Sequence, residues 1–226
     1  MRGLNSKLSC KQVITMKTKE LFCAKGQSFS KVAKKRGHET WTTDILSNVG
    51  ADYVGDVLEE ECQKVIDKNI QDADVVWMSP DCTKWSLAAG NTYWTKYRMP
   101  RNQKAIDAMK MMMFCRYVAN ECIKRNKIFF IENPNGRCVW ILDNKYLKRV
   151  WYCQYGDIRA KPTNIYTNLD IEFRTCFNGN KDCHHEAAPR GSKTGTQGLK
   201  NWQDRSRIPE KLLDYIFDKL ETHKHR

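Results

Sequence analysis

The sequence lacks the long apolar runs that would place it in a membrane. No run among its 226 residues reaches bilayer-spanning length, and its start, MRGLNSKLSCKQVITMKTK, lacks the apolar centre of a signal peptide. It also has no low-complexity tract and no internal repeat. These absences predict an intracellular globular protein of one large domain, or one domain with a small appendage, and its 41% hydrophobic content is enough for a sizeable core.

The cysteines lack the compact framework of a small secreted domain. All ten are scattered through predicted strands and helices. In a reducing compartment most of them stay thiols, and a few can be metal ligands. The chain also has no His-x-Glu followed by Pro-Cys-x-x-Cys, which excludes a zinc deaminase.

Acidic residues are missing from one long stretch. Residues 83–106 contain five basic residues and no acid, and residues 1–40 carry ten Lys or Arg against two Glu. Residues 52–74, in contrast, hold eight acids and two lysines. With a net charge of +13 and a pI near 9.3, this separation favours a nucleic-acid face, and an ordinary solvated basic surface is the alternative.

Apolar strands alternate with amphipathic helices along the chain. Strands are predicted over residues 18–23, 39–44, 51–57, 73–79, 127–133, 149–156 and 164–170. Helices are predicted from a cap at Gln27 or Ser28, from residue 58 to about 69, and over 102–126 and 209–221. This order predicts an α/β fold with a mostly parallel seven-stranded sheet and helices on both faces.

Chemically active residues stand where these strands end. In an open parallel sheet, ligands bind at the carboxyl ends of the strands. The predicted ends carry the Cys23–Gly26 turn, Asp44, Asp56, Cys82 and Glu132. One rim of the sheet therefore offers a glycine turn, a thiol and three carboxylates.

Cys82 has the setting of a nucleophile. Pro80 stops the strand before it, and the loop after it carries only positive charge, which would hold a thiolate. A buried apolar thiol is the alternative for Cys82, and a capped turn before Pro134 is the alternative for Glu132. On one rim, a thiolate that adds to C6 of a pyrimidine and a carboxyl at N3 would make C5 nucleophilic enough to accept a methyl group.

A series of motifs resembles the DNA (cytosine-5) methyltransferases, in the compact form often encoded by bacteriophages. In chain order the motifs are ELFCAKGQSFSKVAKKRGH, TTDI, VGDV, SPDCTKWS, IENPNGR, YGDIRAKPTNIYTN, GTQGL and RSRIPEKLLDYIF. The resemblance covers nearly the whole chain from Met16. It implies an S-adenosylmethionine-dependent (Rossmann-like) fold and a monomer that flips a cytosine out of DNA and methylates C5 through a Cys82–C6 adduct. It also implies DNA modification, as in restriction–modification, in the cytoplasm of a bacterial host.

The resemblance assigns roles residue by residue. It places Phe22 near the adenine of S-adenosylmethionine, Asp44 at the ribose hydroxyls and Asp56 at the adenine, within the cofactor set Phe22, Cys23, Ala24, Lys25, Gly26, Ser28, Phe29, Asp44, Ile45, Asp56, Val57, Pro80 and Ser206. The catalytic set is Cys82, Glu132, Arg159 and Lys161. The nucleic-acid set is Lys84, Trp85, Ser86, Lys96, Arg98, Arg101, Gln197 and Gly198.

The expected organisation has four parts. Residues 16–168 form the catalytic domain, 1–15 a basic extension, 169–200 a short recognition segment, and 201–226 a helix that returns to the catalytic domain. The recognition segment is far shorter than is usual in the family. We therefore expect low specificity, or a share of the recognition for the loop 83–103, where NTYWTKYRMPR interleaves aromatic and basic residues.

Three departures from the family pattern keep other functions open. Only Gly26 remains of the usual two or three glycines, Asp81 replaces a proline, and Lys161 replaces an arginine. One alternative is a catalytically impaired methyltransferase-fold protein that binds nucleic acid. Another is cysteine-dependent C5 alkylation of a different pyrimidine, in RNA or in a free nucleotide.

The run CFNGNKDCHHE has metal-like spacing. We predict a structural zinc site formed by Cys176, Cys183 and His184, with Cys153 as a conceivable further ligand. The alternatives are a packed thiol pair and histidines that contact phosphate.

Overall fold

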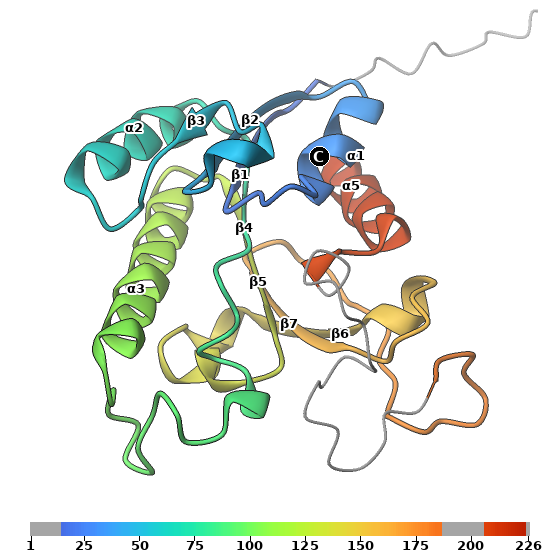
Figure 1. Cartoon of the computed structure of the whole chain (residues 1–226). Helices are drawn as coiled ribbons and strands as arrows, with labels where there is room; N and C mark the ends of the chain where they lie inside the picture. The colour runs from blue at the N-terminus through green and yellow to red at the C-terminus, as the bar shows by residue number, and fades with distance from the viewer. Residues whose placement is uncertain (1–14, 187–205, 225–226) are drawn as a thin grey trace, which may run out of the picture.

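Seven strands form a sheet whose order determines which loops meet. The computed structural model describes residues 15–186 and 206–224 (Figure 1). The strands are β1 (Lys17–Leu21), β2 (Glu39–Asp44), β3 (Tyr53–Val54), β4 (Val75–Met78), β5 (Ile128–Pro134), β6 (Leu147–Trp151) and β7 (Pro162–Thr167), in the order β3-β2-β1-β4-β5-β7-β6. β7 pairs antiparallel with β5 and β6, and the other pairs are parallel. The prediction of a mostly parallel seven-stranded sheet is confirmed.

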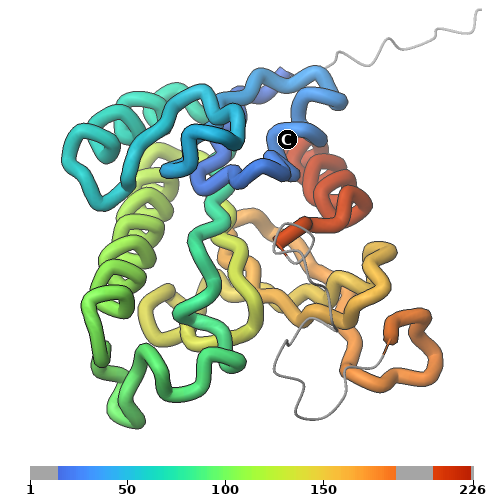
Figure 2. The backbone as a smooth tube through the Cα atoms, in the orientation of Figure 1, coloured from blue at the N-terminus to red at the C-terminus, as the bar shows by residue number. Residues whose placement is uncertain are grey.

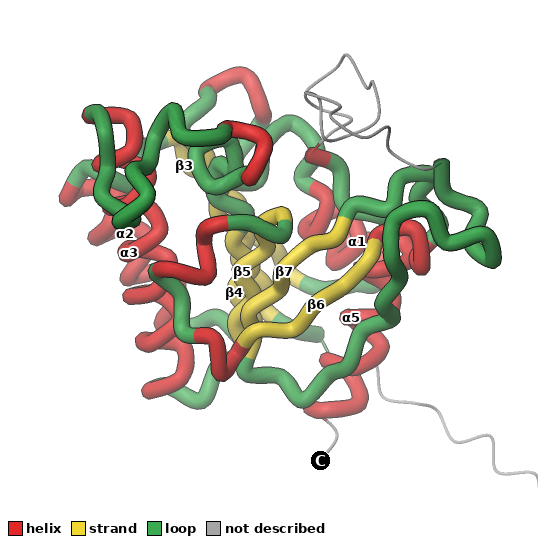
Figure 3. The backbone as a smooth tube through the Cα atoms, turned by 90° about the horizontal axis from the view of Figure 1, so that it is seen from below, coloured by secondary structure: helices red, strands yellow, loops and turns green. Residues whose placement is uncertain are grey.

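Helices cover both faces of the sheet because the central strands are apolar on both sides. Val75 and Trp77 of β4 pack with α1 (Ser28–Lys35) and α5 (Glu210–Lys224), whereas Val76 and Met78 pack with α2 (Glu60–Gln71) and α3 (Gln103–Lys124). Figure 3 shows α2 and α3 on one side of the strands and α1 and α5 on the other.

Two predicted strands are shorter than expected. The strand predicted over 51–57 is reduced to Tyr53–Val54, and the one predicted over 149–156 ends at Trp151. At that point Trp151 lies opposite Pro162, which has no N–H to extend the ladder. Residues Tyr152–Tyr155 instead form a short 3₁₀ helix.

A buried carboxyl group, rather than the predicted Gln27 or Ser28 side chain, caps α1. Gln27 occupies the cap position without a side-chain cap hydrogen bond. Glu20 of β1 accepts hydrogen bonds from the amides of Phe29 (3.3 Å) and Ser30 (2.9 Å). Burial raises the pKa of Glu20 to about 7, although these hydrogen bonds act in the opposite direction.

The C-terminal helix α5 packs against α1. The Phe29 ring stacks on Trp77 at 5.0 Å and on Phe217 of α5 at 4.9 Å. Arg36 follows α1 and pairs with Asp218 (2.6 Å) and Glu221 (2.9 Å) of α5. Apolar stacking and ion pairs thus hold α5 beside the element that follows β1.

The strand order creates a switch point between β1 and β4. From β1 the chain proceeds to β2 and β3 on one side, and it reaches β4 and β5 on the other. Ligands bind at the carboxyl ends of the strands beside such a point. The segments after β4 and after β7 (green and orange in Figure 2) both occupy the lower part of the view. In residues 15–186 and 206–224, no helix is long and apolar enough to cross a membrane.

The Glu20 carboxyl should make the folded state less stable as the pH rises. Its folded pKa near 7 lies above the reference value of 4.5, so between these values the unfolded chain is ionised while the folded chain keeps the proton. Between pH 5 and 6.5 we expect the wild type to lose roughly 1 kcal/mol per pH unit relative to Glu20→Gln. Urea unfolding at several pH values measures this difference, and parallel pH profiles would contradict it.

Candidate active site

The loop after β4 carries Cys82 at a tight turn. Cys82 is half-buried, and its carbonyl oxygen accepts hydrogen bonds from the amides of Trp85 (3.1 Å) and Ser86 (2.9 Å). The neighbouring Asp81 carboxylate accepts hydrogen bonds from the Thr83 amide (2.9 Å), the Thr83 hydroxyl (2.6 Å) and the Lys84 ammonium group. Burial opposes ionisation of Asp81, but these bonds prevail and lower its pKa.

The loop after β5 docks onto the loop that carries Cys82. Asn133 donates a hydrogen bond to the Pro80 carbonyl at 3.0 Å, and the Arg137 amide donates to the Trp85 carbonyl at 2.8 Å. A Cβ atom at Gly136 would lie 2.5 Å from the Trp85 oxygen, so the close approach of the loops requires glycine. The sequence motifs SPDCTKWS and IENPNGR therefore form one unit.

The Glu132 carboxyl group is held by a tyrosine that the sequence analysis missed. The buried Tyr152 donates a hydrogen bond from its hydroxyl to Glu132 Oε1 at 2.8 Å. Lys161 Nζ lies 4.4 Å from the Tyr152 ring centre. Burial lowers the pKa of Lys161, and the charges of Glu132 and Cys82 act to raise it. The signal available in the sequence was a tyrosine at the end of an apolar strand.

Arg159 lies at the same place and is fixed by a neighbouring carboxylate. Its Nε donates to Asp157 Oδ1 at 2.7 Å, and Nη2 pairs with Asp157 Oδ2. Burial opposes ionisation of Asp157, but hydrogen bonds from Arg159 lower its pKa. Arg159 also acts electrostatically on Tyr152 and Lys161. Glu132, Arg159 and Lys161 thus all interact with Tyr152, and Cys82 interacts electrostatically with Glu132 and Lys161.

The electrostatic surroundings keep the Cys82 thiol protonated. Burial, Glu132 and Asp81 together raise the pKa of Cys82 to about 11, and Lys161 acts to lower it. Lys84, predicted to offset Asp81, does pair with it. Even with this pairing, the pKa of the thiol stays above its ordinary value, so the protonated form prevails at neutral pH.

The loops after β1, β2 and β3 lie at the same edge of the sheet as the loop that carries Cys82. Asp44 accepts hydrogen bonds from the amides of Ala24 (2.8 Å) and Leu46 (2.9 Å). Asp56 accepts one from the Leu58 amide at 2.9 Å. Ile45 is 60% exposed, which leaves an apolar surface beside Asp44. This arrangement offers carboxylate oxygens, exposed apolar surface and a backbone turn.

In the turn after β1, three residues other than glycine have the positive φ angles that glycine adopts most easily. Phe22, Ala24 and Gln27 have φ values of 61°, 48° and 41°. Such values cost free energy for residues with side chains and cluster at functional sites. Gly26 does not have a positive φ, and a Cβ atom there would approach only Ser28 Oγ, at 3.4 Å. No contact within the described residues therefore requires Gly26.

Several predicted ligand contacts fall on side chains that belong to the core. From the cofactor set, Phe29 and Val57 are buried among apolar side chains, as is Trp85 from the nucleic-acid set. Trp85 stacks on Trp94 at 4.7 Å and so anchors its loop instead of presenting a base-stacking surface. Cys23 is also buried, and burial raises its pKa to about 12.

The remaining predicted contact residues have varied positions. Lys25 and Gly26 are exposed at the turn, Ser28 begins α1, and Ser206 is exposed before α5. Pro80 is buried. Gln197 and Gly198 lie outside the described residues.

Two basic side chains of the loop 83–103 lie close to aromatic rings. Arg98 lies 5.5 Å from the Trp140 ring centre, and Lys96 lies 4.9 Å from that of Tyr97. Arg101 donates a hydrogen bond to the Trp94 carbonyl at 3.3 Å. These contacts shape the loop, and Ser86 likewise caps the short helix Leu87–Ala89 within it.

A second cluster of potential ligands lies beyond β7. Cys153, Cys176, Cys183 and His185 could hold a metal ion, since their ligand atoms lie within 4.8 Å of one another. The predicted ligand His184 is wrong: its side chain is exposed and Nε2 lies 3.0 Å from the Asp157 carbonyl oxygen. His185 takes its place because the turn directs that side chain inward.

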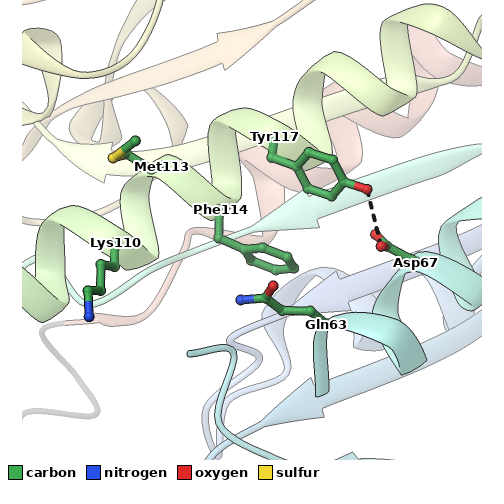
Figure 4. Close-up of a pocket in the computed structure, with 6 residues that line it drawn as sticks. All are labelled: Gln63, Asp67, Lys110, Met113, Phe114 and Tyr117. Carbon is green, nitrogen blue, oxygen red and sulfur yellow. Dashed lines mark hydrogen bonds between the residues drawn. The ribbon is translucent and has the colours of Figure 1, made fainter. Parts of the chain in front are cut away.

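A separate hollow of about 380 Å³ lies between α2 and α3 (Figure 4). It is lined by Gln63, Asp67, Lys110, Met113, Phe114 and Tyr117. The Tyr117 hydroxyl donates a hydrogen bond to Asp67 at 3.1 Å across it. None of the predicted site residues lines this hollow.

Comparison with known proteins adds no family to this description. No protein-family model and no curated protein matches the sequence. The function is therefore inferred from the arrangement of Cys82, Glu132, Tyr152, Arg159 and Lys161.

Removal of a nearby negative charge should activate the Cys82 thiol. Glu132 acts more strongly than Asp81 on its pKa. At pH 8 we expect Glu132→Gln to accelerate alkylation of Cys82 by iodoacetamide several-fold, and Asp81→Asn to have a smaller effect, because each lowers the thiol pKa. Peptide mapping by mass spectrometry measures the rate, with Cys62 as an internal control. Equal or slower alkylation in both variants would contradict the electrostatic account.

Proposed function

We propose that this chain transfers a methyl group from S-adenosylmethionine to C5 of cytosine in DNA. The observation that carries the proposal is the position of Cys82 and Glu132 on the loop and strand end of the adjacent parallel strands β4 and β5. The hydrogen bond from Asn133 to Pro80 joins the two segments. A nucleophile and a buried carboxyl group at one place suit addition to C6 and hydrogen bonding to N3 of a pyrimidine.

In this proposal, the proton that Cys82 loses is the one that N3 of the cytosine gains. Cys82 loses its proton as the S–C6 bond forms, and N3 gains one. Glu132 relays this proton, because it acts electrostatically on the thiol and is only 7% exposed. Tyr152 fixes the orientation of the carboxyl group, and Lys161 stabilises the thiolate. Methyl transfer to C5 leaves S-adenosylhomocysteine, and the C5 proton then passes to solvent water. The S–C6 bond breaks as N3 returns its proton through Glu132, which restores the Cys82 thiol and releases neutral 5-methylcytosine.

The residues around the β1 turn suit the proposed methyl donor. S-adenosylmethionine supplies an electrophilic methyl group on a sulfonium sulfur. Asp44 would accept hydrogen bonds from ribose hydroxyls, since each carboxylate oxygen that accepts one amide has a further lone pair. Ile45 offers an exposed apolar surface for the adenine. Gly26 leaves room for a ligand to approach the backbone.

The basic loop suits a nucleic-acid substrate. Leu87, Tyr97 and Met99 are large apolar residues that are more than 60% exposed on the loop that follows Cys82. Exposed apolar and aromatic side chains beside lysines and arginines can stack on unpaired bases and occupy the gap that a flipped base leaves.

A second candidate function is nucleic-acid binding without catalysis. The pKa of about 11 for Cys82 favours it, because very little thiolate exists at neutral pH. The glycine-poor turn that contains Phe22, Ala24 and Gln27 favours it as well.

Covalent trapping distinguishes the two functions. With S-adenosylmethionine, the wild type should form a covalent complex with DNA that contains 5-fluorocytosine, because fluorine at C5 blocks the final loss of a proton. Cys82→Ser should abolish the complex, whereas Cys62→Ser, a matched change on α2, should keep it. Denaturing electrophoresis and mass spectrometry detect the adduct. DNA binding without any adduct would favour the second function, and 5-fluorocytosine RNA tests the substrate class.

A side chain at Gly26 should weaken donor binding and leave the fold intact. Gly26→Val places branched carbons where the protein itself leaves space. We expect the Kd for S-adenosylmethionine to rise at least tenfold by isothermal titration calorimetry. The Tm and the affinity for DNA serve as controls and should stay unchanged. Unaltered donor binding would show that the donor does not approach this turn.

A further inference from the structure

The cysteine–histidine cluster beyond β7 has the composition of a structural zinc site. Three thiols and one imidazole form a Cys₃His set. Cys153 comes from the 3₁₀ helix after β6, and Cys176, Cys183 and His185 come from the segment after β7. All four are separate groups, since the three cysteines are free thiols. A tetrahedron with Zn–S bonds of about 2.3 Å places its sulfurs about 3.8 Å apart, so ligand atoms within 4.8 Å need little movement.

The histidine provides an independent indication of a ligand. His185 is only 7% exposed, and its Nδ1 is buried without a hydrogen-bond partner among the described residues. A buried polar atom in this state is costly unless something binds it. A metal ion on Nδ1 moves the ring proton to Nε2. The Gly179 amide, 3.1 Å from Nε2, must then turn to another acceptor.

Amide donors already surround the sulfurs. Asn180 Nδ2 donates to Cys176 Sγ at 3.4 Å, and Gln154 Nε2 donates to Cys183 Sγ at 3.6 Å. Such N–H donors stabilise metal-bound thiolates and orient them.

Residues 174–186, which carry three of the four ligands, have no buried apolar side chain. Residues 168–186 contain no helix and no extended strand. They nevertheless contact the loop that positions Arg159. The Glu186 amide donates to the Ile158 carbonyl at 2.9 Å, and His184 Nε2 lies 3.0 Å from the Asp157 carbonyl oxygen.

We propose that Cys153, Cys176, Cys183 and His185 bind one structural zinc ion, which fixes the segment 168–186 against the loop that carries Arg159. The ion takes a role that a hydrophobic core has elsewhere, because residues 174–186 bury no apolar side chain of their own. The proposal does not depend on methyl transfer, since it concerns only the ligand set and the order of the segment.

Metal analysis of the full chain tests the ligand set. We expect about one zinc per chain by plasma mass spectrometry. His185→Ala and Cys183→Ser should lose at least four fifths of it, whereas His184→Ala, the adjacent matched control, should keep it. Cobalt loading should give the intense thiolate-to-metal absorption of a tetrahedral site. Equal zinc in His184→Ala and His185→Ala, or a metal-free wild type that gives no cobalt spectrum, would overturn the proposal.

A second measurement avoids variants that fail to fold. In the wild type, removal of zinc by a chelator should raise alkylation of Cys176 and Cys183 at least tenfold, and alkylation of Cys82 should change less than twofold. Peptide mapping reads all three sites in one experiment. Unchanged alkylation, or a disulfide between any two cysteines of the cluster in the freshly purified protein, would refute zinc ligation.

Discussion

The contact between the loops after β4 and β5 is the constraint on which the candidate active site depends. Parallel pairing of these strands brings their carboxyl ends to one edge. The Asn133–Pro80 hydrogen bond and the approach of Gly136 to the Trp85 carbonyl then fix one loop on the other. Without this contact, the loop that carries Cys82 would be free of the strand end that carries Glu132. With it, the Glu132 charge acts on the Cys82 thiol.

The surroundings of Cys82 act on its thiolate in opposite directions. Burial, Glu132 and Asp81 disfavour the Cys82 thiolate, and Lys161 favours it. Lys161 in turn is buried, which lowers its own pKa. A resting thiol in such a site is protected from oxidation and indiscriminate alkylation, because the thiolate is the reactive form. A substrate that brings positive charge, or accepts the proton, changes the balance at the moment it binds.

The turn after β1 also contains backbone conformations that cost free energy. Phe22, Ala24 and Gln27 occupy backbone conformations that favour glycine. Hydrogen bonds from Ala24 to Asp44 and from the Gln27 side chain to Val49 hold the turn in place. These hydrogen bonds therefore stabilise a backbone conformation that glycine would adopt at lower cost.

The sequence by itself determined the sheet, its helical cover and the positions where strands end. Hydrophobic periodicity is a local property, so the apolar run before Ser79 could only be a strand buried on both faces. It also pointed to Cys82 and Glu132, since each follows or ends a recognisable strand, whereas Arg159 and Lys161 came only from the family resemblance. Only the tertiary structure decided which side chains face inward: it buried Phe29 and Trp85, brought Tyr152 onto Glu132, and chose His185 over His184. These outcomes depend on packing between segments far apart in the chain, and a local pattern carries no information about which neighbour will lie opposite.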